Sequence, residues 1–370
     1  TIKSEFKNLK LDNDENSGDL LVFVDRETSD RICSHFNSDW SHGDYQWRNE
    51  KRQSRQWIHF DDHTFHALEQ DLSDKLHAQP LVQNLVVKAL RSHFADTNPS
   101  KPLVLSFHGP WGVGKNFAAY LIADRLYKKG RDSKFVQHIS ATVLFPDKFA
   151  DSDLVSEYQA ELRNIVTQKV ANCGRQLFII DEVDRIATGV LDGLQQFLIS
   201  NDEINGVDCR KAVFILISNV GADRIASVAY DFWRKGKERN EIKVNDIISN
   251  EEQTPFGNNL FKNIAIDYIV PFLPLEKSHI KLCIIDYMRK RYKGNEIDDE
   301  AFLEKKLDFT QSSKNRYKLS TAFIFLPQVA DSLLYFPPDS KMYSTYGCKR
   351  VQAKVPLFIE ELNSNQTEHK

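Results

Sequence analysis

The chain has 370 residues, 41% of them hydrophobic, and a formal net charge of −3. This length and apolar content can bury a core in one large domain or two ordinary ones. The near balance of charge gives no indication of a polyanion-binding protein, and no apolar run approaches the ~18 residues of a membrane-spanning helix. Because the sequence begins at Thr1, we expect its N-terminus to be missing or processed, and the absence of a signal peptide carries no inference.

The first 65 residues show no regular pattern and are expected to form an irregular N-terminal extension. Within them, residues 44–60 are basic, with Trp47 and Trp57 interleaved. This pattern fits either a nucleic-acid-binding strip or a solvated segment with two anchoring aromatic side chains. The acidic balance of the whole chain favours the second interpretation, so we expect no nucleic-acid partner.

Regular patterns begin near residue 66, where two segments carry apolar residues at helical spacing. A buried strand over 102–109 enters a glycine-rich turn, and an amphipathic helix follows over 115–130. Two further apolar strands are expected over 175–186 and 211–219. Strands that alternate with helices predict a parallel α/β sheet flanked by helices.

Pro271 and Pro274 mark a boundary, and two charged, helix-like segments follow over 279–292 and 297–309. We therefore expect a large α/β nucleotide-binding subdomain, then a small helical subdomain, and finally a polar tail. With the N-terminal extension, the expected boundaries are 1–65, 66–270, 271–355 and 356–370.

The segment HGPWGVGKNF (108–117) has the composition of a phosphate-binding loop. Its glycines permit positive φ and close backbone approach, so that N–H groups can converge on phosphate oxygens at the start of the following helix. Lys115 can reach the β and γ phosphates. Asn116 stands where Ser or Thr normally meets Mg²⁺, and a carboxamide oxygen is also a hard, neutral ligand. The expected nucleotide-binding residues are Gly109, Pro110, Trp111, Gly112, Val113, Gly114, Lys115, Asn116 and Asp181.

Two later strands end in polar side chains suited to the rest of a nucleotide site. In LFIIDEVD (177–184), Asp181 is expected to hold Mg²⁺ and Glu182 to polarise the attacking water. The alternative is an acid pair that caps the next helix. Asn219, after the third strand, is expected to orient the lytic water, and an ordinary helix N-cap is the alternative.

The order of phosphate loop, acidic strand and polar strand tip is that of an AAA+ ATPase. Six segments then resemble the torsin family of AAA+ ATPases: GPWGVGKNF, FIIDEVDRI, AVFILISNVGADRI, AYDFWRKGKER, DYIVPFLPLEKSHIKLC and YGCKRV. The resemblance covers about residues 70–355. Asn after the loop lysine and a Gly-Cys-Lys near the C-terminus are themselves torsin features. A parallel sheet flanked by helices and followed by a small helical lid is the fold that this resemblance implies.

By the same resemblance, the chain is an ATP hydrolase of the lumen of the endoplasmic reticulum and nuclear envelope that remodels protein or membrane assemblies. ATP and Mg²⁺ are the implied cofactors, with Asn116 and Asp181 at the metal. Glu182 is the implied catalytic glutamate, Asn219 the first sensor and Lys349 the second sensor at the γ-phosphate. The sequon Asn365-Gln366-Thr367 is compatible with a lumenal glycoprotein.

Torsins hydrolyse ATP poorly until a membrane-anchored activator of the lamina-associated polypeptide type supplies an arginine finger from its luminal domain. The resemblance implies such a partner here, implies a homo- or hetero-oligomer, and leaves peripheral membrane association open. It also implies a disulfide between Cys283 and Cys348 beside the second sensor, the alternative being two buried thiols. Cys173 and Cys209 are expected to be core or loop thiols.

Two other classes of function stay open. The chain could be an ATP-gated binding module that rarely hydrolyses ATP, although the intact Glu182 argues against a purely non-catalytic role. It could also be a redox-responsive chaperone governed by Cys283 and Cys348. A threading unfoldase is disfavoured, because residues 145–155 contain Phe145 and Phe149 but no aromatic–hydrophobic–glycine loop.

Overall fold

The computed structural model of the chain describes residues 62–199, 207–248, 261, 263–291 and 326–367, together with three short strands between residues 10 and 47. The longer elements are α2 (Asp62–Lys75), α3 (Pro80–Ala95), β4 (Leu103–His108), α4 (Lys115–Leu126), β5 (Val136–Ser140), α6 (Ser152–Asn172), β6 (Leu177–Asp181), β7 (Val213–Ser218), α8 (Ala222–Arg234), β8 (Tyr268–Pro271), α10 (Lys277–Arg291) and α13 (Val351–Thr367). The shorter ones are η2 (Gly130–Asp132), α5 (Ala141–Leu144), η3 (Val183–Arg185), η4 (Val190–Leu194), α7 (Gln195–Ile199), η5 (Arg239–Glu241), α9 (Val244–Ile247), β9 (Tyr335–Phe336), β10 (Tyr343–Ser344) and η8 (Gly347–Arg350).

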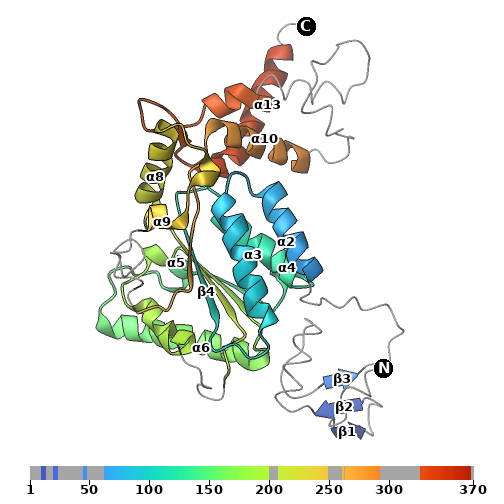
Figure 1. Cartoon of the computed structure of the whole chain (residues 1–370). Coiled ribbons are helices and arrows are strands. Elements are labelled where there is room, and N and C mark those ends of the chain that lie inside the picture. Colours follow the sequence, from blue (N-terminus) through green and yellow to red (C-terminus); the bar gives the residue numbers. More distant parts are fainter. Residues whose placement is uncertain are drawn as a thin grey trace.

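A five-stranded parallel sheet forms the centre of the large subdomain, with its strands in the order β5-β6-β7-β4-β8 (Figure 1). The expected parallel α/β sheet is therefore confirmed. Two of its strands, β5 and β8, were not expected from the sequence. Both lie at the edges of the sheet, where burial is less complete, and β8 ends in Pro271, which is tolerated at an edge because it has no N–H to donate.

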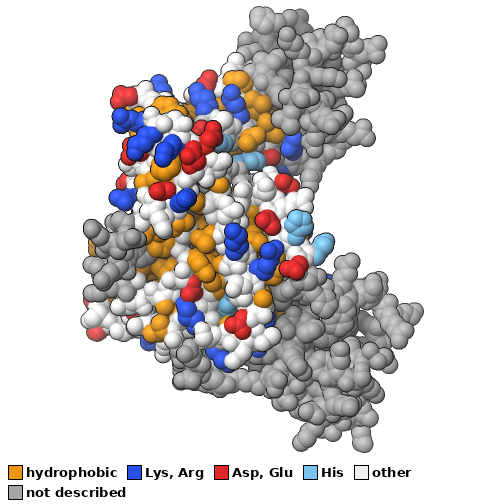
Figure 2. All heavy atoms as spheres, viewed as in Figure 1, with side chains coloured by type: hydrophobic (Ala, Val, Ile, Leu, Met, Phe, Trp, Pro, Cys, Tyr) orange, Lys and Arg blue, Asp and Glu red, His pale blue; other side chains and the backbone are white. Residues whose placement is uncertain are grey.

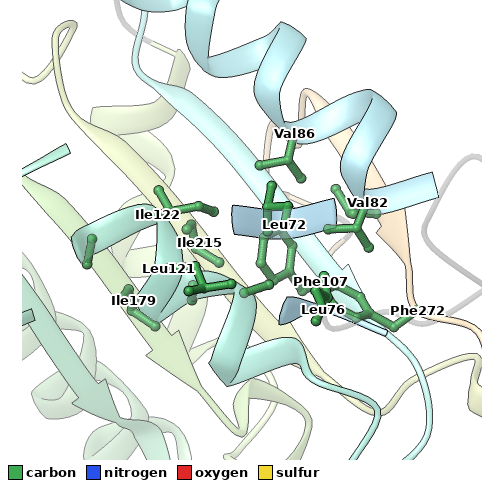
Figure 3. Close-up of a cluster of buried hydrophobic side chains, with 14 of the residues drawn as sticks. Leu72, Leu76, Val82, Val86, Phe107, Leu121, Ile122, Ile179, Ile215 and Phe272 are labelled. Carbon is green, nitrogen blue, oxygen red and sulfur yellow. The ribbon is translucent and has the colours of Figure 1, made fainter. Parts of the chain in front are cut away.

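Alternate side chains of the central strands pack into two separate hydrophobic cores, one on each face of the sheet. Ile215 of β7 packs on the face covered by α2, α3 and α4, where Leu72, Val86 and Ile122 meet it (Figure 3). Phe214 points to the other face and stacks on Phe178 of β6, with 4.7 Å between ring centroids. Strands buried on both faces read as continuous apolar runs, which explains why the central strands stand out in the sequence.

Helices α10 and α13 pack together beyond the sheet, at the top of Figure 1. They agree with the expected helical character of the region after Pro271. The expected boundary at residue 355 is wrong. Helix α13 runs from Val351 to Thr367, so most of the segment expected as a polar tail continues this helix. The helix-like segment 297–309 lies outside the described residues.

The N-terminal expectation also needs correction, because β1 (Lys10–Asn13), β2 (Leu20–Phe23) and β3 (Tyr45–Trp47) form a three-stranded antiparallel sheet. Helix α2 starts at Asp62, a few residues before the expected boundary. The side chains of the basic segment 44–60 are not among those described. Within the described part of the chain, none of the helices has the length and apolar character needed to cross a membrane. Acidic and basic side chains lie side by side over the described surface in Figure 2.

Candidate functional site

The site is built where β4, β6 and β7 end, because the carboxyl ends of parallel strands meet at one edge of the sheet. His108, the last residue of β4, pairs in register with Ser218, the last residue of β7. The phosphate loop follows His108, Asp181 ends β6, and Asn219 follows β7. The structure therefore brings together the three polar segments that the sequence places far apart.

The loop between β4 and α4 has the backbone that its glycines predict. Gly112 and Gly114 have φ values of 71° and 105°, which L side chains rarely adopt. Lys115 opens α4 with its side chain buried, and its ammonium donates to the carbonyl oxygens of Gly109 and Pro110 at 2.6 and 2.8 Å. A third bond, 3.0 Å long, goes to Oδ1 of Asn219. The lysine thus lies folded over the loop.

The pKa of Lys115 is lowered to about 8, chiefly by burial; the charges of Asp184 and Asp181 oppose this shift, and the charge of Lys349 adds to it. The desolvated ammonium lacks a full counter-charge in this arrangement. A polyphosphate on the loop would supply one, as expected of a phosphate-binding lysine.

Asn116 and Asp181 are in direct contact, because the amide nitrogen Nδ2 of Asn116 donates to Oδ2 of Asp181. Because Nδ2 is the donor, this bond orients the amide with its nitrogen towards the Asp181 carboxylate and leaves the oxygen Oδ1 for another partner. The pair offers one carboxylate and one carboxamide oxygen, a donor set that suits Mg²⁺ held partly by phosphate and water. The residues present therefore fit the expected metal, and Asn116 provides an oxygen donor where Ser or Thr is usual.

Glu182 stands immediately after β6 in the left-handed region, with φ 59° and ψ 35°, a conformation uncommon for a non-glycine residue. Its carboxylate accepts a 2.7 Å hydrogen bond from Oγ1 of Thr142 and lies 3.3 Å from a guanidinium nitrogen of Arg185. Its own N–H donates to Asp181. Glu182 stands at the N-cap position of η3, but its side chain makes no cap hydrogen bond and is held by Thr142 from the segment after β5.

Asn219 connects the third strand to the rest of the site. Its backbone N–H donates to Asp184 at 3.1 Å, and its side-chain oxygen accepts from Lys115. Helix α8 has Gly221, not Asn219, at its N-cap, and no side-chain cap bond is made there. The alternative of an ordinary N-cap is therefore wrong for Asn219.

The expected second sensor lies directly on the phosphate loop. The N–H of Cys348 in η8 donates to the carbonyl of Gly112 at 3.0 Å. The approach is so close that a Cβ on Gly347 would stand 2.3 Å from the Gly112 oxygen, and a Cβ on Gly112 would stand 2.0 Å from the carbonyl oxygen of Tyr346. Lys349 follows, close enough for its charge to affect Lys115.

Cys283 and Cys348 form a disulfide, with Cα atoms 5.9 Å apart, which ties η8 to α10. The bond expected from the resemblance is present, next to Lys349. Cys209 is a buried free thiol, as expected. The expectation for Cys173 is wrong, because that buried residue is disulfide-bonded.

Several residues that support the site carry no signal of their own in the sequence. Gln79, fully buried before α3, donates to the carbonyls of Val113 and Leu273 and accepts from the N–H of Leu273 at 2.8 Å. It thereby joins the phosphate loop to the chain after β8. Arg239 binds the carbonyls of Ala78 and Pro274 in the same region. Thr142 follows β5, so identifying that strand would have pointed to it.

Three comparisons with known proteins agree with this geometry. The family model described as Torsin matches residues 56–180. A "Torsin-like protein" of Caenorhabditis elegans is 38% identical over 305 residues, covering 80% of this chain and 78% of that protein. The solved structure of the S. cerevisiae Hsp104-ADP complex superposes with a TM-score of 0.52 at 18% identity, covering 84% of this chain and 50% of the other, so this chain spans half the length of that one.

The likeness to Hsp104 concerns the fold, which is that of the AAA+ ATPases. The alignment with the relative of 38% identity covers most of both chains, so the similarity includes far more than the phosphate loop. With the loop, the acidic strand and the Gly-Cys-Lys segment joined at one edge of the sheet, the chain belongs to the torsin family of AAA+ ATPases.

Proposed function

We propose that this torsin-family protein hydrolyses ATP at the site described above, and that it does so effectively only when an activator completes the site. The observation that carries the proposal is the convergence of Lys115, the Asn116–Asp181 pair, Glu182 and Asn219 at one edge of the sheet. Each group has the chemistry and the position of a working part of an AAA+ ATPase.

Different residues of the chain bind the phosphates, accept the proton and orient the attacking water. The loop amides and the N-terminus of α4 bind the phosphates, and Lys115 turns from the loop carbonyls to phosphate oxygens. Glu182 accepts a proton from the attacking water, which Asn219 orients from the neighbouring strand. Lys349 reaches the γ-phosphate from η8. Bound Mg²⁺, held by Asn116 and Asp181, would neutralise charge on the β and γ phosphates.

The activator and the location follow from the family. We propose that the luminal domain of a membrane-anchored protein of the lamina-associated polypeptide type supplies an arginine in trans, in a homo- or hetero-oligomeric assembly. An arginine supplied in this way is worth about 10³–10⁵ in rate. The proposed location is the lumen of the endoplasmic reticulum and nuclear envelope, and the proposed work is remodelling of protein or membrane assemblies there. The Cys283–Cys348 disulfide supports an oxidising compartment.

Steady-state ATP hydrolysis tests the proposal, using the purified chain alone and with the activator's luminal domain. Glu182→Gln provides the blank, since it removes the base and keeps a similar shape. We expect low activity alone and a large increase with the luminal domain. Substantial activity alone would place an arginine finger within this chain and contradict the dependence on a partner.

A second candidate function is an ATP-gated, redox-sensitive binding module. It is favoured by one observation: the disulfide residue Cys348 is hydrogen-bonded to the phosphate loop at Gly112. Such a module would bind ATP yet hydrolyse none of it with the activator present. Its partner would bind more tightly with ATP than without nucleotide, and the Cys283→Ser, Cys348→Ser double variant would lose that difference. Equal partner binding in both nucleotide states would exclude gating.

A further inference from the structure

Trp111 of the phosphate loop contacts two cationic side chains, Arg185 and Lys349, whose roles in the proposed mechanism are otherwise separate. Trp111 is 41% exposed, although large aromatic side chains are usually more buried. The guanidinium carbon of Arg185 stands 4.8 Å from the centroid of its ring, and the ammonium of Lys349 stands 5.5 Å from it. Both distances are within the range of a cation–π interaction, for which tryptophan is the best partner.

The two cations belong to different parts of the proposed site, one next to the catalytic glutamate and the other at the second sensor. Arg185 ends η3 and pairs with Glu182, the proposed base, at 3.3 Å. Lys349 belongs to η8, next to the disulfide that fixes η8 to α10. The indole of Trp111 contacts both cations and so joins the second sensor to the turn that carries Glu182.

We propose that Trp111 is a positioning residue that couples the second sensor to the catalytic glutamate. This inference rests on the proposed ATPase function and deepens it. In the structure, Lys349 and Arg185 share the indole. A γ-phosphate attracts Lys349, whose charge already acts on Lys115 in the phosphate site. The indole then interacts with Arg185 alone, and Arg185 orients Glu182 for the attacking water.

The first test is spectroscopic and needs no hydrolysis. Intrinsic tryptophan fluorescence is titrated with ATP and with ADP, both with Mg²⁺, in the full chain. We expect ATP to change the emission more than ADP does, because only ATP has the phosphate that draws Lys349 from the ring. Trp111→Phe should lose the ATP-specific change, and Lys349→Met should reduce the ATP response to that of ADP.

Trp233 provides the matched control, since it is also about half exposed but lies on α8 and stacks on Tyr230. Trp233→Phe should keep the ATP-specific change. A full ATP-specific change in Trp111→Phe or in Lys349→Met would overturn the proposal. Calorimetry on the same samples separates the two levels of inference: if neither nucleotide binds the parent, the proposed ATPase function itself fails.

The second test measures kcat with the activator domain in Trp111→Leu, Arg185→Met and the double variant. Each single change should lower kcat by about threefold to tenfold with little change in the KM for ATP. Because Trp111 acts through Arg185, the double variant should lose no more than either single one. Trp111→Phe, which keeps a π face, should recover most of the parent kcat. Multiplying effects, or equal loss in the Phe and Leu variants, would show that Trp111 has no such role.

Discussion

At the scale of single residues, Lys115 gives the most direct chemical prediction. Its pKa is lowered to about 8 by burial, so at pH 8.5 most of the nucleotide-free protein carries a neutral lysine. Phosphate oxygens stabilise the ammonium and raise this pKa again. ATP binding at pH 8.5 should therefore take up roughly 0.7 of a proton at this residue. Calorimetry in buffers of different ionisation enthalpy measures that number.

Lys115→Arg is the control for this prediction, because a guanidinium stays charged throughout this pH range. The nucleotide's own titration contributes equally in both proteins, so the difference between them isolates the lysine. Equal proton uptake by the parent and the arginine variant would show that the buried lysine remains charged before ATP arrives.

Gln79 gives a second prediction at the same scale. Replacing it by Leu keeps the volume but leaves the N–H of Leu273 and two carbonyls without their buried partner. We expect Gln79→Leu to lower the free energy of unfolding by about 3 kcal/mol and to weaken ATP binding, since Val113 lies within the phosphate loop. Denaturant unfolding measures the first effect. Gln168→Leu on the exposed face of α6 should change stability by less than about 0.5 kcal/mol.

At the scale of elements, the contact between η8 and the phosphate loop can be tested with two glycines. Gly347 and Gly236 both have positive φ, at 50° and 67°. Alanine at either position is strained by about 1 kcal/mol. Only at Gly347 does the added Cβ also meet a neighbour, the Gly112 oxygen at 2.3 Å, whereas nothing lies within 4 Å at Gly236. Gly347→Ala should therefore weaken ATP binding, and Gly236→Ala should leave it unchanged.

Fluorescently labelled nucleotide gives the affinities for both glycine variants. Similar losses at the two positions would mean that backbone strain matters and that the η8 contact does not. The comparison is informative because both variants share the conformational penalty and differ in the steric one.

The elements that sequence reasoning found and missed differ in burial. The central strands β4, β6 and β7 are apolar almost throughout, and their polar ends show where the site is. The edge strands β5 and β8 alternate or end in proline, so their sequences carry a weaker signal. Thr142 and Gln79 were missed for a related reason: each acts through a hydrogen bond to a residue distant in sequence. Spacing along the chain does not encode such contacts.

At the scale of the whole molecule, the sequence pattern did not indicate where the last helix of the chain ends. The boundary expected at Pro271 rests on two prolines that interrupt the pattern there and stays a prediction, whereas α13 continues past residue 355 to Thr367. Among its described side chains, Phe358 and Ile359 are the last that pack against the core, and Leu362 is the last apolar residue of its sequence. Beyond them the polar sequence resembles a tail, although the backbone remains helical. Helix propensity alone gives too weak a signal to set such an end.

One buried histidine and one half-buried histidine, His108 and His279, predict how the stability of the protein depends on pH. His108 lies under the phosphate loop, where Nδ1 donates to the carbonyl of Val220 and Nε2 accepts from Ser106, and burial lowers its pKa to about 4. Burial likewise lowers the pKa of His279, at the start of α10, to about 4, helped by the charge of Arg239. The unfolded chain, with histidine pKa values near 6.5, binds protons between pH 6.5 and 4 that the folded chain does not.

The folded state must therefore lose stability as the pH falls from 6.5 towards 4, by about 2 kcal/mol for each histidine between pH 7.5 and pH 5. Urea unfolding at a series of pH values measures this slope. His108→Gln and His279→Gln should each flatten it, whatever their effect on stability at neutral pH. A slope unchanged in both variants would mean that neither histidine is neutral in the folded protein. His108 joins β4 to the chain after β7 in the large subdomain, and His279 lies in α10 of the helical lid. Acid should therefore lower the stability of both subdomains together.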